Sequence, residues 1–480
     1  MVIDMASRIA FWLGLLALLS GEAQAGLDYT LRLHGDGTEL AVHLCAPDGL
    51  AAGELRSGDR DSTRWLLAID GDGSSRPRRS GERIVHSGLS AGQCLRYRVD
   101  LRSAGRGDRY GLGWRDDAYA MQRLSDWFWR PQRIPAGTQA SVAFPDGWSA
   151  SLPWTPSDAS GRRYRIPDTP RSWEGFSAFG RFEERRLDYP GGRLRVTLLP
   201  TTRPIPTPAL LRWLDLNTRA VLTSSGRLPL ADAQVLVVPL PGVRSPTPWG
   251  QVARGGGSAL RLFTGLDASE AERNEDWTLS HELSHLFHPY LGDGGRWLSE
   301  GLASYYQNVL RARAGILTPE RAWSKLDAGF GRGHDERSTR GQRLSEVSAG
   351  YRGTMRVYWS GAAYWLEADA ALRERHGQSL DAVLERFAER HLPAYQTWSP
   401  ERFTAELDRL AGTRLFVPMY QRYAADTRFP DLDDTYRRLG IGTGIQRLRS
   451  DPNAPAAAIR DAIMARSPDS VRAADAAVAR

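Results

Sequence analysis

Two histidines and two glutamates stand close together in the segment "HELSHLFHPYLGDGGRWLSEGLASYY", which runs from His281 to Tyr306. His281 and His285 are four residues apart, so on a helix both imidazoles lie on one face, one turn apart. Two neutral imidazoles so placed can coordinate one Zn²⁺ ion at about 2.0–2.1 Å. Glu282 occupies the adjoining position, where a carboxylate can take a proton from a water activated by the metal. The spacing therefore predicts a zinc site with Glu282 as general base.

A catalytic zinc needs a third protein ligand and an open fourth position. Pro289 and the run "GDGG" must end the first helix, and "RWLSEGLASYYQNVL" begins a second one. The connection is long enough to bring the second helix back across the first, so Glu300 is the predicted third ligand. The alternative is that His281 and His285 are ordinary helix residues and Glu300 a surface carboxylate. His288 lies outside the motif, and we expect a surface residue or an indirect contact to the metal site.

The segment resembles known zinc peptidases. HExxH followed by a glutamate on the next helix is the gluzincin pattern, and "WLSEGLASYY" resembles the "WxxEGxxxYY" block of the glycyl aminopeptidase family. It is more distantly similar to the "WLNEGFA" block of the aminopeptidase-N family. Downstream, "VYWSGAAYWLEADAALRERHGQSLDAVL" is similar to the segment that opens with Tyr-x-x-Gly in both families.

The resemblance implies a zinc peptidase that hydrolyses peptide bonds of a peptide or protein substrate through a zinc-activated water. It implies that Tyr358 stabilises the oxyanion, which suits a phenol, because its hydroxyl can donate to developing negative charge. The alternative is that Tyr358 is one more packing tyrosine.

One expected feature is missing from the strand "GGGSALRLF", which matches the glycine-led edge strand of these families. That strand usually carries a glutamate for the substrate's free amino group, but here Ser258 to Arg261 supply no acid. A buried ammonium needs a carboxylate partner. We therefore expect N-acetylated peptides to be cleaved at least as fast as their free-amine counterparts.

Stepwise changes of pattern divide the 480 residues into segments of an α+β multidomain protein. Apolar residues after Arg8 and the "AQA" before Gly26 indicate a signal peptide over 1–25, hence export to the periplasm or secretion. Short alternating strands predict a β-sandwich-like domain over 26–196. A strand–helix mixture over 197–310 holds the zinc motif, and the resemblance implies a thermolysin-like catalytic domain there. A helical lobe over 311–449 and a flexible or weakly helical tail over 450–480 follow.

The composition limits the classes of partner that the protein is expected to bind. The formal net charge is +7, but the arginines are interspersed with acids, so a basic nucleic-acid surface is disfavoured. No later segment is apolar enough for stable membrane insertion once the signal is removed. Cys45 and Cys94 are the only cysteines, and an oxidising compartment allows them to pair, although sequence leaves their distance open.

Two other functions stay open from sequence. One is a catalytically silent zinc-binding scaffold, against which the intact Glu282 argues. The other is a periplasmic protein that binds peptides or carbohydrates through exposed tryptophans in "DWFWRP", residues Asp126–Pro131. Core packing of these tryptophans is the favoured alternative.

Overall fold

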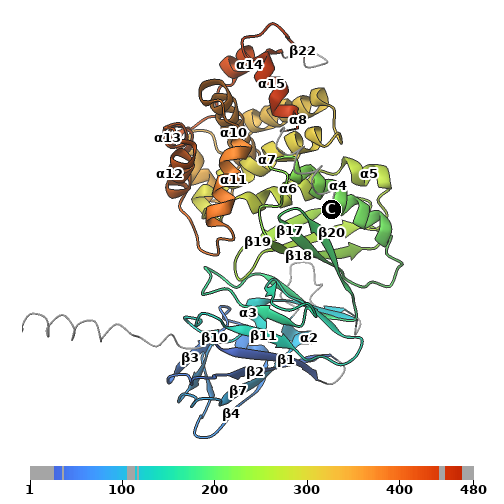
Figure 1. The fold of residues 1–480 in the computed structure, drawn as a ribbon, viewed down its shortest axis with the longest axis vertical. Helices are drawn as coiled ribbons and strands as arrows, with labels where there is room; N and C mark the ends of the chain where they lie inside the picture. Colours follow the sequence, from blue (N-terminus) through green and yellow to red (C-terminus); the bar gives the residue numbers. More distant parts are fainter. Residues whose placement is uncertain (1–25, 35–36, 105–113, 116–117, 443–448, 467–480) are drawn as a thin grey trace, which may run out of the picture.

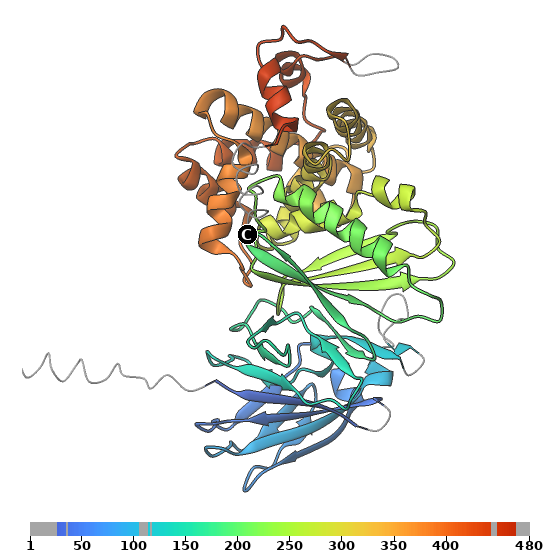
Figure 2. The same ribbon diagram turned by 45° about the vertical axis from the view of Figure 1, so that its right-hand side comes forward.

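The computed structural model describes residues 26–34, 37–104, 114–115, 118–442 and 449–466. A β-rich lobe, a five-stranded sheet and a helical lobe are stacked along the long axis of the molecule (Figures 1 and 2). The protein is thus a mixed α and β multidomain protein with a β-rich N-terminal region and a helical C-terminal region. The predicted signal peptide lies outside the described residues. Within them, no helix combines the length and apolar character needed to cross a membrane.

The β-rich lobe is built from three sheets. Alternation of apolar and polar residues in β1 (Asp28–His34) places Tyr29, Leu31 and Leu33 in the core. The first sheet has the order β13 (Thr155–Pro156), β14 (Arg163–Arg165), β11 (Gln139–Val142), β1, β2 (Glu39–Cys45), β7 (Cys94–Asp100), β4 (Leu66–Gly71). The second has β10 (Arg130–Pro131), β3 (Gly53–Arg56), β6 (Arg83–His86), β5 (Arg78–Ser80), and the third β12 (Ser149–Ser151), β15 (Phe176–Gly180), β9 (Tyr119–Arg123), β8 (Trp114–Arg115). Short helices η1 (Ser62–Trp65), α2 (Leu101–Ala104) and α3 (Leu124–Trp127) connect them.

Two sequence expectations are settled in this lobe. Cys45 and Cys94 face each other in the β2–β7 register and are joined by a disulfide, so the pairing that sequence allowed is confirmed. Trp127 and Trp129 of "DWFWRP" are fully buried. An exposed aromatic platform there is therefore wrong, because these rings fill the lobe's core beside Trp154 and Trp173.

The central sheet has the order β16 (Glu184–Tyr189), β17 (Gly192–Leu198), β18 (Asp232–Leu240), β20 (Ala259–Gly265), β19 (Trp249–Ala253). Strands β17, β18 and β20 are parallel, and the two edge strands are antiparallel to their neighbours. The expected boundary at residue 196 falls inside β17. Because β16 and β17 pair with β18 rather than with the first lobe, the second unit begins near residue 184.

The two faces of the central sheet pack differently. Helix α4 (Thr207–Leu222) covers one face together with α6 (Thr278–Ser284), through a core that contains Leu214, Val235 and Leu283. The other face packs on β9 and β15 of the first lobe, through Met121, Phe176 and Phe263 among others. Helix α5 (Glu270–Glu275) precedes α6. The α6 helix is thereby fixed between the sheet and the helical lobe.

The helical lobe begins after the zinc motif. The helices expected over 298–314, 355–375 and 379–391 are present as α7 (Arg296–Arg313), α10 (Thr354–His376) and α11 (Leu380–His391). Around them lie α8 (Pro319–Asp335), α9 (Leu344–Ala349), α12 (Pro400–Ala411), α13 (Phe416–Ala425) and α14 (Asp433–Leu439). Thr318, Ser379 and Ser399 cap three of these helices by accepting a backbone N–H, as their residue types favour.

The segment after residue 450 differs in part from expectation. Beyond the short pair β21 (Ile441–Gly442) and β22 (Arg449–Ser450), helix α15 (Ala457–Met464) buries Ile463 and Met464. It is anchored by Arg313 Nε, which donates to the carbonyl of Ile463 at 2.8 Å. Of the two alternatives for this tail, flexible or weakly helical, the helix is present over Ala457–Met464, and it is packed rather than loose because its few apolar residues share one face. Residues 467–480 lie outside the described part.

Candidate metal centre

The two histidines of the motif are held on a short buried helix. His281 belongs to α6, and His285 continues it as the first residue of η3 (His285–Phe287). Leu279, Leu283 and Leu286 are all buried in the core, so the helix presents its histidines to the opposite side. The two imidazole rings lie 5.0 Å apart and nearly perpendicular. The one-turn spacing thus brings both rings to one place, as sequence predicted.

Glu300 reaches the same place from the first half of α7. Its Oε2 lies 3.1 Å from Nε2 of His281 and 3.6 Å from Nε2 of His285. One ligand atom from each of the three residues falls within a 4.8 Å cluster. The segment between the helices contains η4 (Asp293–Gly295), and it turns α7 back across α6 as the sequence predicted. Two imidazole nitrogens and a carboxylate oxygen are a donor set that fits Zn²⁺.

Further side chains orient the imidazoles. Gln307 Oε1 lies 2.9 Å from His281 Nδ1, and a carbonyl oxygen accepts a hydrogen bond, so Nδ1 carries the proton. Ser299 Oγ lies 3.2 Å from His285 Nδ1 and 3.3 Å from Nε2 of His288. Such partners of the second ring nitrogen fix the orientation of metal-binding histidines. In both rings Nε2 is left to face Glu300.

The sequence predicted the surroundings of His288 only in part and gave no role to Gln307. His288 is 1% exposed, so of the two expectations the surface position is wrong and the indirect contact, through Ser299, is present. Gln307 was not singled out at all. Its spacing could have indicated it, because residue 307 lies two helical turns after Glu300 and therefore on the same face of α7.

Glu282 lies beside the cluster and against the edge strand β19. A Cβ placed on Gly250 would come within 2.7 Å of its Cγ, so the strand and the glutamate are in close contact. Burial, reinforced by the Glu300 carboxylate, raises the pKa of Glu282 to about 7, although His281 and Arg254 act in the opposite direction. Within the described residues no hydrogen bond to its carboxylate is found. A carboxylate in this state can exchange a proton near neutral pH.

Tyr358 comes from α10 and stacks on His281, with ring centroids 5.8 Å apart. Two glycines make this possible: a Cβ on Gly361 would lie 1.9 Å from the Trp297 carbonyl, and one on Gly301 would collide with Gly361. Helices α7 and α10 therefore touch at backbone level, which explains the Tyr-x-x-Gly spacing. Burial and the Glu300 carboxylate raise the pKa of Tyr358, so its hydroxyl keeps its proton and can donate it in a hydrogen bond.

These side chains open into a cleft of about 620 Å³. Its walls include β19, the turn after His288 and the first residues of α7, with Arg171 and Glu174 contributed by the β-rich lobe. Arg254 closes the base by donating to the carbonyls of His285 and His288. The cleft is thus formed by all three parts of the molecule.

The strand expected to line this cleft is a different one. The segment "GGGSALRLF" lines the cleft with its first residue, Gly255, but from Ala259 it forms β20, which lies between β18 and β19. Arg261 is buried against Phe176 and Trp249 with its Nη2 on Gln251. The correction follows from sheet order: the chain forms the edge strand β19 first and then returns inside it. The cleft-lining part of β19, Trp249 to Ala253, also carries no acid.

One family profile matches a part of the chain that contributes to this site. The M61 glycyl aminopeptidase profile matches residues 291–375, which include Glu300 and Tyr358. The chain resembles the glycyl aminopeptidases. None of the curated proteins compared with it matches in sequence.

Solved structures show a similar fold. An aminopeptidase N family protein from Idiomarina loihiensis is 14% identical, with a TM-score of 0.62 over 86% of this chain and 78% of the other. An M1 zinc metallopeptidase from Deinococcus radiodurans is 16% identical, with a TM-score of 0.48 over 85% of this chain and 96% of the other. At such identity the first likeness establishes the arrangement of the lobes and nothing more specific.

Proposed function

We propose that the chain is a zinc-dependent peptidase of the gluzincin type. One observation carries the proposal: His281, His285 and Glu300 converge within 4.8 Å in a cleft that also holds Glu282 and Tyr358. The region from β16 onward is then the thermolysin-like catalytic unit, in which the antiparallel edge strand β19 offers backbone groups to an extended peptide.

Each residue has a role that its position supports. His281, His285 and Glu300 would hold the zinc, while Gln307 and Ser299 keep the two imidazoles oriented. Zinc, when bound, supplies a Lewis acid that polarises the scissile carbonyl and lowers the pKa of a water. Glu282 accepts a proton on its carboxylate and passes it to the leaving amine. The Tyr358 hydroxyl donates a hydrogen bond to the oxygen that gains negative charge.

We also propose that the protein is exported, to the periplasm or beyond. The apolar N-terminal segment with its "AQA" site motivates this. The disulfide between Cys45 and Cys94 supports it, because such bonds persist in oxidising compartments. Recovery of mature protein that begins at Gly26 from outside the cytoplasm would test it, and full-length protein in the cytosol would contradict it.

Elemental analysis of the purified protein tests the metal site directly. We expect one zinc per chain in the wild type and loss of zinc in His285→Ala, while Glu282→Gln keeps it. A full equivalent of zinc in His285→Ala would show that the ligand assignment is wrong. Zinc without turnover of any member of a mixed peptide library would instead favour a silent zinc-binding scaffold.

A further inference from the structure

A second cavity, of about 430 Å³, adjoins the cleft. Tyr358 lines both cavities, and Gln307, which contacts His281, lines the second. Trp277 forms another wall, with its ring 5.4 Å from that of His281. We call this cavity the cationic pocket, after three of its lining residues: Arg311, Lys325 and Arg332.

The positive charge of the cationic pocket is not neutralised from within. No acidic residue lines it among those the structure describes. Arg311 is fully buried, and only its Nη2 is used, donating to the carbonyls of Asn274 and Glu275 at 3.0 Å. Its Nε and Nη1 have no partner in the described part of the chain. A buried donor without a partner costs about 1–3 kcal/mol, so Arg311 contributes an incompletely compensated positive charge to the wall of the pocket.

Lys325 and Arg332 supply the two other positive charges, and the Arg332 guanidinium lies 4.9 Å from the centroid of the Trp359 ring. Within the described residues, neither Lys325 nor Arg332 forms a hydrogen bond or an ion pair. Two carboxylates outside the lining, Glu275 and Asp276, act on Arg311, and Glu275 is engaged by both terminal nitrogens of Arg321 at 2.8–2.9 Å. Burial and the positive charge of Arg311 lower the pKa of Lys325, as expected where cations gather without an anion.

Part of the remaining wall is apolar and partly exposed. Trp277 is 44% exposed and Met355 36%, and they are two of only four large apolar side chains so exposed among the described residues. A third, Tyr351, lines the cleft itself. Exposed apolar side chains that gather at one place mark a binding surface. Here they gather beside the metal ligands.

We propose that the cationic pocket is a substrate subsite that binds the carboxylate of an aspartate or glutamate side chain within two residues of the scissile bond. The proposal rests on the peptidase function proposed above. Arginine donors and a lysine recognise a carboxylate, while Trp277 and Met355 cover its aliphatic stem. The shared wall at Tyr358 requires the acidic residue to lie close to the bond that is cleaved.

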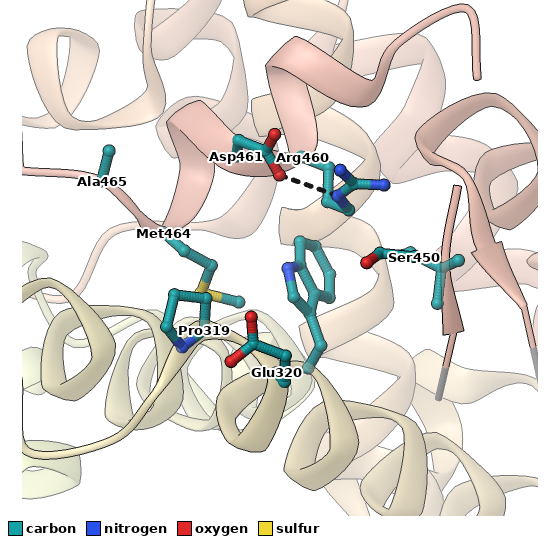
Figure 3. Close-up of a pocket in the computed structure, with 9 residues that line it drawn as sticks. Pro319, Glu320, Ser450, Arg460, Asp461, Met464 and Ala465 are labelled. Carbon is teal, nitrogen blue, oxygen red and sulfur yellow. Dashed lines mark hydrogen bonds and ion pairs between the residues drawn. The ribbon is translucent and has the colours of Figure 1, made fainter. Parts of the chain in front are cut away.

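In a third cavity, the lining arginine already has hydrogen-bonding partners. It lies between α8 and α15, where Figure 3 shows Arg460 beside Asp461 at the mouth. Arg460 Nε donates to Asp461 at 2.8 Å, and its Nη1 donates to the carbonyl of Asp451 at 2.9 Å. Its arginine already has partners, so this cavity offers no comparable anion site.

The test compares peptides that differ only in one side chain. Once a cleaved sequence is known from a library, glutamate and glutamine are exchanged at each position within two residues of the scissile bond, with both peptide ends capped. We expect a Glu/Gln ratio in kcat/KM of about tenfold or more at one position, mainly through KM. Lys325→Met and Arg332→Met should each reduce that ratio several-fold, whereas Lys325→Arg should retain it. Arg390→Met, at an exposed position on α11, is the control and should leave the ratio unchanged.

The outcomes separate this inference from the proposed function. Turnover with no Glu/Gln preference at any position would overturn the subsite and leave the peptidase intact. A preference seen only for peptides with a free C-terminus would overturn the side-chain assignment in favour of a terminal carboxylate. If no peptide is cleaved, calorimetry with the same pairs still tests the pocket: tighter binding of the glutamate peptide that depends on Lys325 supports it, and equal binding overturns it.

The sequence offers a second measurement. Lys325 is the only lysine, so amine reagents act on this side chain and the α-amino group alone. Acetylation removes the Lys325 charge and should reduce the Glu/Gln ratio as Lys325→Met does, whereas reductive dimethylation keeps the charge and should preserve it. Mass spectrometry of a peptide that contains residue 325 confirms the modification. Equal ratios after both treatments would contradict the role of Lys325.

Discussion

Helix α7 carries Glu300 in its first half and Arg313 at its last residue, and each end belongs to a cluster of enclosed charges. Arg313 binds the Asp381 carboxylate at 3.0 Å, and the Tyr306 hydroxyl donates to the same carboxylate at 2.8 Å. Nearby, Asp369 accepts from Arg373 and from the Tyr305 hydroxyl, both at 2.9 Å. This second cluster therefore pairs every carboxylate with an arginine.

The first cluster lacks such pairing. The carboxylates of Glu300 and Glu282 share one cleft, where imidazoles and the Arg254 guanidinium act on them but neither carboxylate forms an ion pair with an arginine in the described part of the chain. Although burial acts against it, Asp381 raises the pKa of Arg313 further, whereas burial raises the pKa of Glu282 to about 7. Removal of one partner from a buried ion pair destabilises a fold, whereas a buried carboxylate with a shifted pKa is a candidate for chemistry. The contrast along one helix separates the cluster of paired charges, called the structural cluster below, from the cluster that we propose to bind zinc, called the functional cluster.

The largest expected effect breaks the structural cluster. Arg313→Met removes the closer of the two arginines on the buried Asp381 carboxylate and leaves Arg373 at 3.6 Å, so we expect the free energy of unfolding to fall by about 3 kcal/mol, the lower end of the range for a broken buried ion pair. Urea unfolding followed by circular dichroism measures it, and zinc content at low urea should stay at one per chain. Arg390→Met, which removes an exposed arginine, should change stability by less than about 0.5 kcal/mol. A similarly small change for Arg313→Met would refute the structural role of the second cluster.

The next effect breaks the functional cluster. Glu282→Gln keeps the shape of the side chain but cannot accept a proton, so kcat should fall by about 10²-fold or more, which is about 2.7 kcal/mol in the barrier. Stability should not fall, because a neutral amide is less costly to bury than a carboxylate. Peptide turnover and urea unfolding on the same preparation give both numbers. Wild-type activity in this variant would remove Glu282 from the mechanism.

A smaller effect tests the role of the Tyr358 hydroxyl. Tyr358→Phe removes one hydroxyl and retains the ring that stacks on His281, so we expect kcat to fall about tenfold, or about 1.4 kcal/mol, with KM little changed. Zinc content should be that of the wild type. If KM rises while kcat is unchanged, Tyr358 contributes to substrate binding and not to the stabilisation of negative charge.

The smallest effect concerns the N-terminal ammonium group of the substrate. The edge strand β19 offers no acid to an N-terminal ammonium, so an acetyl cap should not slow cleavage, and the capped peptide should have at least the kcat/KM of the free amine. The measurement is one peptide with and without the cap. A preference for the free amine of tenfold or more would contradict this, and Glu174 would then be the first residue to replace, because it is an acid from the β-rich lobe that lines the cleft.

Much of the site could be predicted because its determinants are local. The one-turn spacing of His281 and His285 fixes their common face wherever the helix lies. Glycines in the connection require a turn before Glu300. The long helices followed from their periodicity, and the resemblance of the segment from Tyr358 to Gly361 placed a candidate tyrosine at the start of one of them. None of these inferences needed contacts across the whole chain.

Sequence by itself therefore determined which residues form the proposed metal cluster and which helices carry them, because helical spacing is set by the backbone. Only the tertiary structure decided what surrounds the cluster. The order of strands in the sheet differs from their order in the chain, so β19 and not β20 lines the cleft, and Arg261 is buried elsewhere. The burial of His288 and the gathering of Arg311, Lys325 and Arg332 depend equally on how α6, α7 and α8 pack together. Burial and charge at these positions come from residues far apart in sequence, and no local pattern encodes them.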